Sequence, residues 1–187
     1  MTARERIIDA AAIVVRRNGL VAATTKAIAL EAGYSEAMLY KTFADKREIY
    51  LAVLRERGSV LENPADLVGR RDVEENLVDI TRQLMRLYVE SFPVTASVFA
   101  SPELLSAWRE GMTAGRGPRS PIKLVERYLD GEIELGRIDR EIDAFASASL
   151  LCGAAFQHAF FAGFDGLRAV PDERDLAGRL VKNLALS

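Results

Sequence analysis

Apolar residues recur at intervals of three and four along most of the chain, which is the spacing of one face of an α-helix. Near the N-terminus, four residues form such a stripe: Ile7, Ala11, Val14 and Val15. The pair Asn18-Gly19 follows the stripe and tolerates the left-handed backbone conformation in which many helices end. The pattern therefore predicts a first helix from about Ala3 to Asn18.

Two shorter helices are predicted next. Thr24 can cap the first of them, because its hydroxyl can accept from a free backbone amide, and Gly33 closes this helix after about two turns. Ser35 can cap the second, which runs to Thr42 or Phe43. Leu39 and Phe43 are four residues apart and point to the same side, so we expect both to face inward.

The pattern continues with helices that are separated by clear breaks. Asp45 can cap a fourth helix, and a bent connection is predicted near residues 58–71. Asp72 and Glu75 form a capping box that opens a long helix, and Phe92-Pro93 is predicted to end it. Further helices are predicted to open at Ser101-Pro102, at Ser120-Pro121, at about Arg140 after Asp139 (running to Ala162), and after Pro171-Asp172 (running to about Ala185).

The chain has 187 residues and is 49% hydrophobic, which is enough for one or two compact domains. It shows no alternating strand pattern of useful length and no internal repeat. We therefore predict an all-α fold of about nine helices in two domains, residues 1–57 and residues 58–187.

The two short helices joined at Gly33 carry the candidate chemistry. Small residues, Ala29 and Ala32, stand where these helices must approach closely, as in a helix-turn-helix. In that motif the second helix enters the major groove of DNA while the first crosses the backbone. The residues left for the groove and its walls are Glu36, Ala37, Met38, Tyr40, Lys41 and Thr42. On spacing alone, an ordinary helical hairpin with a solvated outer face explains the pattern equally well.

A resemblance separates these two interpretations. The run TTKAIALEAGYSEAMLYKTFADKREIYLAVL, with ARERIIDAAAIVVRRNG before it, resembles the N-terminal DNA-binding domain of the TetR family of bacterial transcription regulators. Several features at fixed spacing carry the resemblance together: the Asn-Gly helix end, Thr24, Ile28-Ala29, Ala32-Gly33, Tyr34-Ser35, Leu39-Tyr40, Phe43 and Asp45-Lys46. It covers about the first 55 residues, and it implies a helical ligand-binding and dimerisation domain in the remainder of the chain.

The resemblance also implies roles for individual residues. It assigns contacts with DNA phosphates to Thr24, Tyr40, Thr42 and Lys46, and a base-facing surface to Glu36, Ala37, Met38 and Lys41. The hydrogen-bonding and apolar groups of the base-facing residues are consistent with base recognition. A lysine can donate to guanine O6 and N7, a glutamate can accept from cytosine N4, and Ala or Met can contact a thymine methyl group.

For the second half, the resemblance implies a pocket for a small apolar effector of unknown identity. Its candidate lining residues are Met85, Tyr88, Trp108, Tyr128, Phe156 and His158. The alternative is that these aromatic residues are ordinary core, and that His158 is a core residue with satisfied hydrogen bonds. Cys152 is expected to be a small buried side chain and not a redox sensor, because no basic neighbour in the sequence suggests a lowered pKa.

The apolar run LLCGAAFQHAFFAGF and the final helix are predicted to form a homodimer interface. The expected contact residues are Gly153, Ala154, Gln157, Leu180 and Leu184. A dimer would present two recognition helices about one DNA turn, roughly 34 Å, apart or a little more, which matches a near-palindromic operator. The alternative is that the same stripe packs within one chain.

Charge and composition restrict the function further. The net charge is −2, but residues 1–57 hold ten Lys and Arg against seven Asp and Glu, so the basic end suits an anionic partner. One cysteine excludes an intrachain disulfide and fits a cytoplasmic protein, and we expect no signal peptide, membrane span, cofactor or metal site. Glu132 and Glu134 are acidic but are expected to be solvated at a helix end.

No catalytic set is evident, so we do not expect an enzyme. The predicted function is a ligand-responsive transcription regulator, favoured as a repressor by the habit of the family. The alternatives are an activator of the same fold and a helical adaptor that binds a protein partner.

Overall fold

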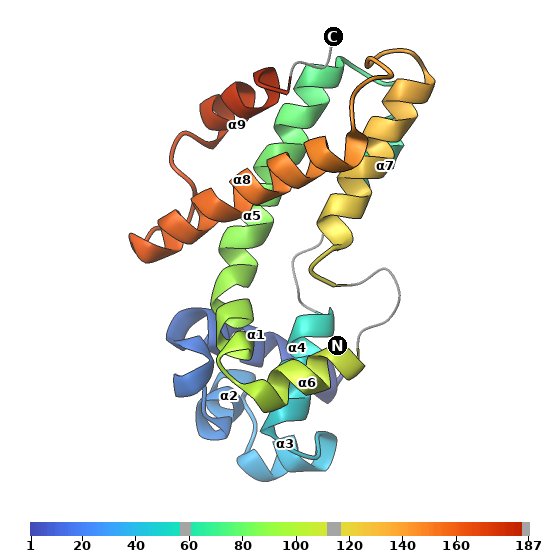
Figure 1. The fold of residues 1–187 in the computed structure, drawn as a ribbon. Helices are drawn as coiled ribbons and strands as arrows, with labels where there is room; N and C mark the ends of the chain where they lie inside the picture. The colour runs from blue at the N-terminus through green and yellow to red at the C-terminus, as the bar shows by residue number, and fades with distance from the viewer. Residues whose placement is uncertain (57–60, 112–116, 185–187) are drawn as a thin grey trace. The chain divides into compact units, whose positions relative to one another are not determined.

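The computed structural model describes residues 1–56, 61–111 and 117–184, and within these ranges every side chain except those of residues 20–22. The described residues form α-helices and one 3₁₀ helix and contain no strand, so the predicted all-α class is confirmed (Figure 1). In chain order the helices are α1 (Ala3–Ala22), α2 (Thr25–Ala32), α3 (Glu36–Thr42), α4 (Lys46–Glu56), η1 (Pro64–Leu67), α5 (Val73–Phe99), α6 (Pro102–Glu110), α7 (Ser120–Glu134), α8 (Ala144–Phe164) and α9 (Glu173–Lys182).

The chain divides into two compact units. The first unit comprises Met1–Ser59 and Ser91–Met112, and the second comprises Val60–Glu90 and Thr113–Ser187. The predicted division after residue 57 lies close to the end of the first of these segments. The segment Ser91–Met112 was expected in the second domain, but it groups with the first unit, because Val94, Val98 and Leu104 are buried in the core of that unit.

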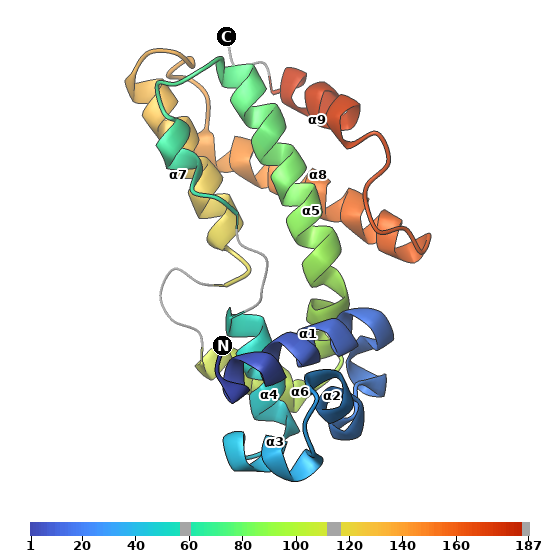
Figure 2. The same ribbon diagram turned by 180° about the vertical axis from the view of Figure 1, so that it is seen from behind.

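The first unit is built around the buried face of α1, against which α2 and α4 pack (Figures 1 and 2). Thr2 begins α1 with a complete capping box, since its hydroxyl accepts from the amide of Glu5 and the Glu5 carboxylate accepts from the amide of Thr2. Gly19 kinks α1 at φ 73°, close to the end that Asn18-Gly19 predicts. Helical hydrogen bonding resumes beyond the kink, so α1 extends to Ala22.

A buried tyrosine ties α4 to the turn before α2. The hydroxyl of Tyr50 donates to the backbone carbonyl of Ala23 at 2.5 Å, and both residues are buried. Burial also raises the pKa of Tyr50 to about 12. The bond satisfies a carbonyl that water cannot reach, and it fixes the backbone directly before Thr24, the cap of α2.

Helix α5 continues through Pro93 to Phe99, so the prediction that Phe92-Pro93 ends this helix is wrong. Proline removes one amide donor from a helix, which is a local cost. Val94 and Val98 bury their side chains in the first core on the turns that follow Pro93. The Ser97 hydroxyl also donates to the Pro93 carbonyl at 2.8 Å. Burial of the following turns therefore compensates for the missing hydrogen bond.

The second unit has its own core, to which α5, α7, α8 and α9 contribute. Asp143 caps α8 by accepting from the amide of Ala146 at 2.8 Å, so the helix begins later than the predicted Arg140. Asp139, the expected cap, instead accepts from the amide of Glu141 in the preceding turn. Helix α9 ends at Lys182, and the predicted end at Ala185 lies outside the described residues.

Glu132 is fully buried near the end of α7, so the expectation that it is solvated is wrong. Its carboxylate lies 3.1 Å from the guanidinium of Arg137, and it accepts from the amide of Gly69 at 3.3 Å. Beside it, the amide nitrogen of Asn76 lies 3.1 Å from the hydroxyl oxygen of Tyr128. The carboxylate therefore has a structural partner of opposite charge, which a buried ion requires.

Helix α8 is long and apolar enough to cross a membrane by length and composition alone. A core helix of a soluble protein meets the same criteria, so this is weak evidence for a span. Eight of its residues are buried inside the second unit: Ala144, Ser147, Ala148, Leu151, Cys152, Ala155, Ala159 and Ala162.

Replacing Tyr50 by Phe should lower the free energy of unfolding by about 1–2 kcal/mol, because the buried Ala23 carbonyl loses its donor. Chemical denaturation at neutral pH measures this change. Tyr40→Phe is the matched control, since Tyr40 is exposed and its hydroxyl has no partner among the described residues. Equal stability of the two variants would show that the Tyr50 hydroxyl contributes nothing.

Candidate nucleic-acid interface

The turn between α2 and α3 sets the angle at which α3 leaves the first unit. Gly33 has a left-handed φ of 72°, which side-chain-bearing residues adopt only at a cost, and its amide bonds back to the end of α2. Arg6 from α1 reinforces the turn. Its guanidinium donates to the Ala32 carbonyl at 3.3 Å and lies 5.0 Å from the centre of the Tyr34 ring. The turn is therefore held from both sides.

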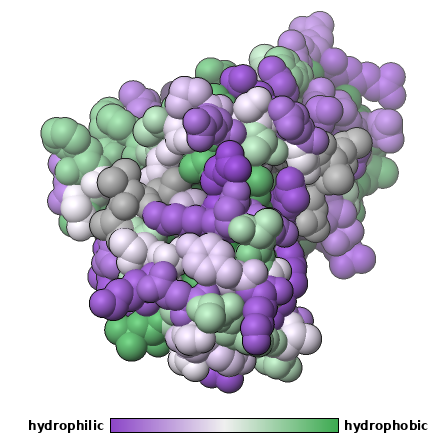
Figure 3. Space-filling view, turned by 90° about the horizontal axis from the view of Figure 1, so that it is seen from below, coloured by the Kyte–Doolittle hydropathy of each residue, from purple (hydrophilic) through white to green (hydrophobic). Residues whose placement is uncertain are grey.

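Helix α3 presents one face to the core and the remainder to the surface. Leu39 is buried, whereas Glu36, Ala37, Tyr40 and Lys41 are exposed. Met38 and Thr42, which were predicted to face DNA as well, are half-buried. The face of the molecule seen from below, the side on which α3 is drawn in Figure 1, carries hydrophilic side chains interspersed with apolar ones (Figure 3).

Thr24 and Lys46, two predicted phosphate contacts, are both linked to Tyr50. The Thr24 hydroxyl accepts from the amide of Ala27 at 3.1 Å, so its own hydrogen remains free to donate. The Lys46 ammonium lies 5.1 Å from the centre of the Tyr50 ring, one turn along α4, and partial burial lowers the pKa of Lys46. The bond from Tyr50 to Ala23 thus connects the beginnings of α2 and α4.

Thr42 is less available than the other predicted phosphate contacts. Its hydroxyl donates to the Met38 carbonyl, one turn earlier in α3, at 3.1 Å. A phosphate contact through that hydrogen would require the intrahelical bond to break.

The charges around α3 are not equivalent. Lys26 and Lys41 are exposed and have no ion-pair partner among the described residues. Three nearby arginines are already paired with carboxylates: Arg4 with Glu56, Arg17 with Glu31, and Arg47 with Asp45. Lys26 and Lys41 are therefore available for an anionic partner.

Sequence reasoning missed three residues that organise this interface: Arg6, Thr25 and Tyr50. Each acts through a contact with a residue that is distant in sequence or on another helix. The side chain of Tyr50 falls on the buried stripe of α4, and a buried phenol needs a hydrogen-bond partner. The sequence therefore indicated that Tyr50 needs a hydrogen-bond partner, but it did not indicate that this partner is the Ala23 carbonyl.

The predicted effector residues do not all belong to one unit. Trp108 packs against the core of the first unit, whereas Met85, Tyr88 and Tyr128 belong to the core of the second. The rings of Tyr88 and Phe156 meet edge to face with centres 5.5 Å apart, and His158 is half-buried on the same helix as Phe156. Cys152 is buried beside Tyr88, and burial raises the pKa of its thiol to about 11.

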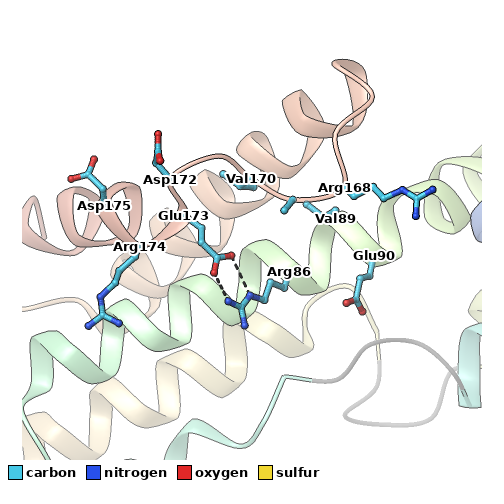
Figure 4. Close-up of a pocket in the computed structure, with 10 residues that line it drawn as sticks. Arg86, Val89, Glu90, Arg168, Val170, Asp172, Glu173, Arg174 and Asp175 are labelled. Atoms are coloured by element: carbon cyan, nitrogen blue, oxygen red, sulfur yellow. Dashed lines mark hydrogen bonds and ion pairs between the residues drawn. The ribbon is translucent and has the colours of Figure 1, made fainter.

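A groove of about 520 Å³ lies in the second unit between α5 and the start of α9 (Figure 4). Glu173 crosses it and pairs with Arg86 and Arg82 of α5. Val89, Ala169 and Val170 supply the apolar part of the lining. None of the predicted effector residues lines this groove.

Helix α8 has a broad apolar face that the second unit leaves exposed. It includes Phe145, Leu150, Phe156, Phe160, Phe161 and Phe164. Of the predicted dimer residues, Gly153 and Gln157 are exposed on α8, and Ala154 is half-buried. Leu180 and Leu184 are half-buried against the second core instead.

Comparison with known proteins agrees with this geometry. Residues 7–53, which contain most of α1 and all of α2 and α3, match the family described as bacterial regulatory proteins, tetR family. A Bacillus subtilis (strain 168) protein, the uncharacterized HTH-type transcriptional regulator YvkB, is 28% identical over 181 residues, which cover 92% of this chain and 90% of the relative.

Solved structures share the fold over nearly the whole length. A Mesorhizobium loti MAFF303099 protein assigned to the TetR family of transcriptional regulators aligns with a TM-score of 0.78 at 22% identity, covering 97% of this chain and 94% of that one. The Bacillus subtilis regulator FadR, solved with stearoyl-CoA, aligns with a TM-score of 0.69 at 20% identity, covering 97% of each chain. Residues 7–53 thus match the helix-turn-helix domain of the TetR family of bacterial regulatory proteins, and the chain is similar over nearly its whole length to regulators of that kind.

Proposed function

We propose that this protein is a homodimeric, sequence-specific repressor that binds a near-palindromic operator and is released from it by a small apolar effector. The observation that carries the proposal is the exposed face of α3, flanked by Thr24 and Lys46. The family is one of transcription regulators and not of enzymes, which supports a role in binding.

In the proposed complex, α3 enters the major groove and the starts of α2 and α4 contact the phosphates on its walls. Thr24 has a free hydroxyl hydrogen for a phosphate oxygen. Lys46 stands in the first turn of α4, where its ammonium and the helix N-terminus both favour an anion. Tyr40 is exposed and can donate its hydroxyl. These contacts position the protein, and Glu36, Ala37, Met38 and Lys41 read the bases.

A second copy of the chain is the proposed partner of the apolar face of α8. A face with several exposed phenylalanines is unusual on a monomer, and TetR-family regulators act as dimers. Gly153 lies on this face with open space beside it, which permits another helix to approach closely. In this arrangement α8 supplies most of the contact, and two α3 helices lie roughly 34 Å apart on the operator.

The effector remains a small apolar molecule in the proposal. FadR from Bacillus subtilis was solved with stearoyl-CoA, which gives one example of a ligand with a long apolar acyl chain on this fold. The aromatic residues Tyr88, Tyr128 and Phe156 of the second unit are the proposed lining, with Met85 and His158. An effector weakens DNA binding only if it binds the free protein more tightly than the complex. A bound molecule that left operator affinity unchanged would contradict this part.

Selection of bound fragments from a random duplex pool, followed by titration at several salt concentrations, tests DNA binding directly. The full-length protein should enrich one near-palindrome and prefer it to random duplex by about 10³ or more. Its affinity should fall steeply as salt rises, because bound phosphates release counterions. Failure to bind any duplex at low salt would exclude the proposed function.

Lys46→Ala should weaken binding to specific and random duplexes by the same factor and reduce the slope of log affinity against log salt by about 1. The reason is that a phosphate contact carries no information about sequence. Lys123→Ala, which removes an exposed charge from α7 of the second unit, is the control and should change neither quantity. A loss confined to the selected operator would contradict the phosphate assignment.

Lys41→Ala should relax the preference at one base position in each half-site and leave the other positions unchanged. Lys41 is exposed on α3 and has no partner in the described part of the chain, so its ammonium is available for guanine O6 and N7. Repeating the selection with this variant measures the change. An equal loss of affinity on every sequence would make Lys41 a phosphate contact.

The double substitution Phe160→Glu and Phe164→Glu should convert the dimer to a monomer, because it places charges on the apolar face of α8. Light scattering coupled to size-exclusion chromatography gives the molar mass. Leu30→Glu is the control, since Leu30 is highly exposed on α2 of the other unit and should not alter the molar mass. A variant with unchanged molar mass would place the interface elsewhere.

A further inference from the structure

A hydrogen bond joins the beginnings of α2 and α3 within the first unit. Thr25 is the first residue of α2, Glu36 is the first residue of α3, and the Thr25 hydroxyl lies 2.8 Å from Oε2 of Glu36. Thr25 is half-buried, whereas Glu36 is exposed on the face proposed to meet DNA. The bond therefore ties a surface carboxylate to the neighbouring helix.

The Glu36 carboxylate differs from the other carboxylates nearby. Several of these are bound by a guanidinium or a backbone amide: Glu5, Glu31, Asp45, Glu48 and Glu56. Glu36 has only the Thr25 hydroxyl, and its Oε1 has no partner among the described residues. One oxygen is thus held in place while the other remains available to accept a hydrogen bond.

A fixed carboxylate on a DNA-facing helix has a narrow choice of partners. It is repelled by the phosphates on both sides of the groove, so it needs a donor on a base edge to compensate. In the major groove only the exocyclic amino groups of cytosine and adenine donate, whereas guanine N7 and O6 and thymine O4 accept. Glu36 can therefore select an amino-bearing base only while its carboxylate is held at the correct place.

The Thr25 hydroxyl has a single hydrogen, and the bond to Glu36 uses it. The same hydroxyl therefore cannot donate to a phosphate while the bond exists. We propose that Thr25 is a positioning residue for sequence recognition: it holds the Glu36 carboxylate so that its free oxygen accepts from the exocyclic amine of cytosine or adenine in each half-site. The proposal rests on the proposed function, in which α3 enters the major groove.

Base selection by the full-length protein and its variants tests this proposal. Thr25→Val keeps the branched shape and removes the hydroxyl, so discrimination at one base pair per half-site should fall about tenfold, the order expected for one base contact. Thr25→Ser restores the hydroxyl and should restore the preference. On a Glu36→Ala background, Thr25→Val should have no further effect, because the interaction it supports is already lost.

The wild-type selection also identifies the base, since enrichment of cytosine or of adenine at the affected pair distinguishes the two amines. Unchanged discrimination in Thr25→Val overturns the proposal. So does an equal loss on every duplex, which would make Thr25 a phosphate contact, and so does a persistent effect on the Glu36→Ala background. A wild-type protein that binds no duplex removes the proposed function and this inference together, and the wild-type measurement alone distinguishes that case.

Discussion

The placement of α3, a helix of only seven residues, depends on the burial of Leu39 within it and of Phe43 directly after it. A helix of that length is not stable by itself in water, because the free-energy cost of nucleation exceeds the gain from the hydrogen bonds of two turns. Burying one such side chain contributes about 1.5–3 kcal/mol, so these two anchors supply much of the stabilisation. Because they also fix the rotation of α3 about its axis, they determine that Glu36 and Lys41 face outward.

The second constraint is that the residues proposed to contact phosphates must keep a fixed position relative to α3. Arg6 holds the turn before α3, and Tyr50 holds the turn before α2 while its ring lies near Lys46. A rigid arrangement of this kind reduces the conformational entropy that binding would otherwise cost. The same residues that stabilise the unit therefore prepare the surface proposed for DNA.

Local signals in the sequence predicted the beginnings of many helices and the orientation of α3. Thr24 as a cap and Gly33 as a left-handed terminator depend only on near neighbours, so both could be read directly. The continuation of α5 past Pro93 could not, because it depends on burial against residues distant in the chain. The burial of Glu132 is similar, since its carboxylate accepts from the amide of Gly69, which is distant in the chain.

The ion pair between buried Glu132 and the exposed residue Arg137 has a consequence for how this chain can change over evolutionary time. Loss of the guanidinium alone would strand a negative charge in an apolar interior, which is far more harmful than loss of both partners. Replacing both residues by apolar residues of similar volume can leave the free energy of unfolding unchanged. The two positions should therefore covary among close relatives: a substitution at one position should be tolerated only when the other position is substituted as well.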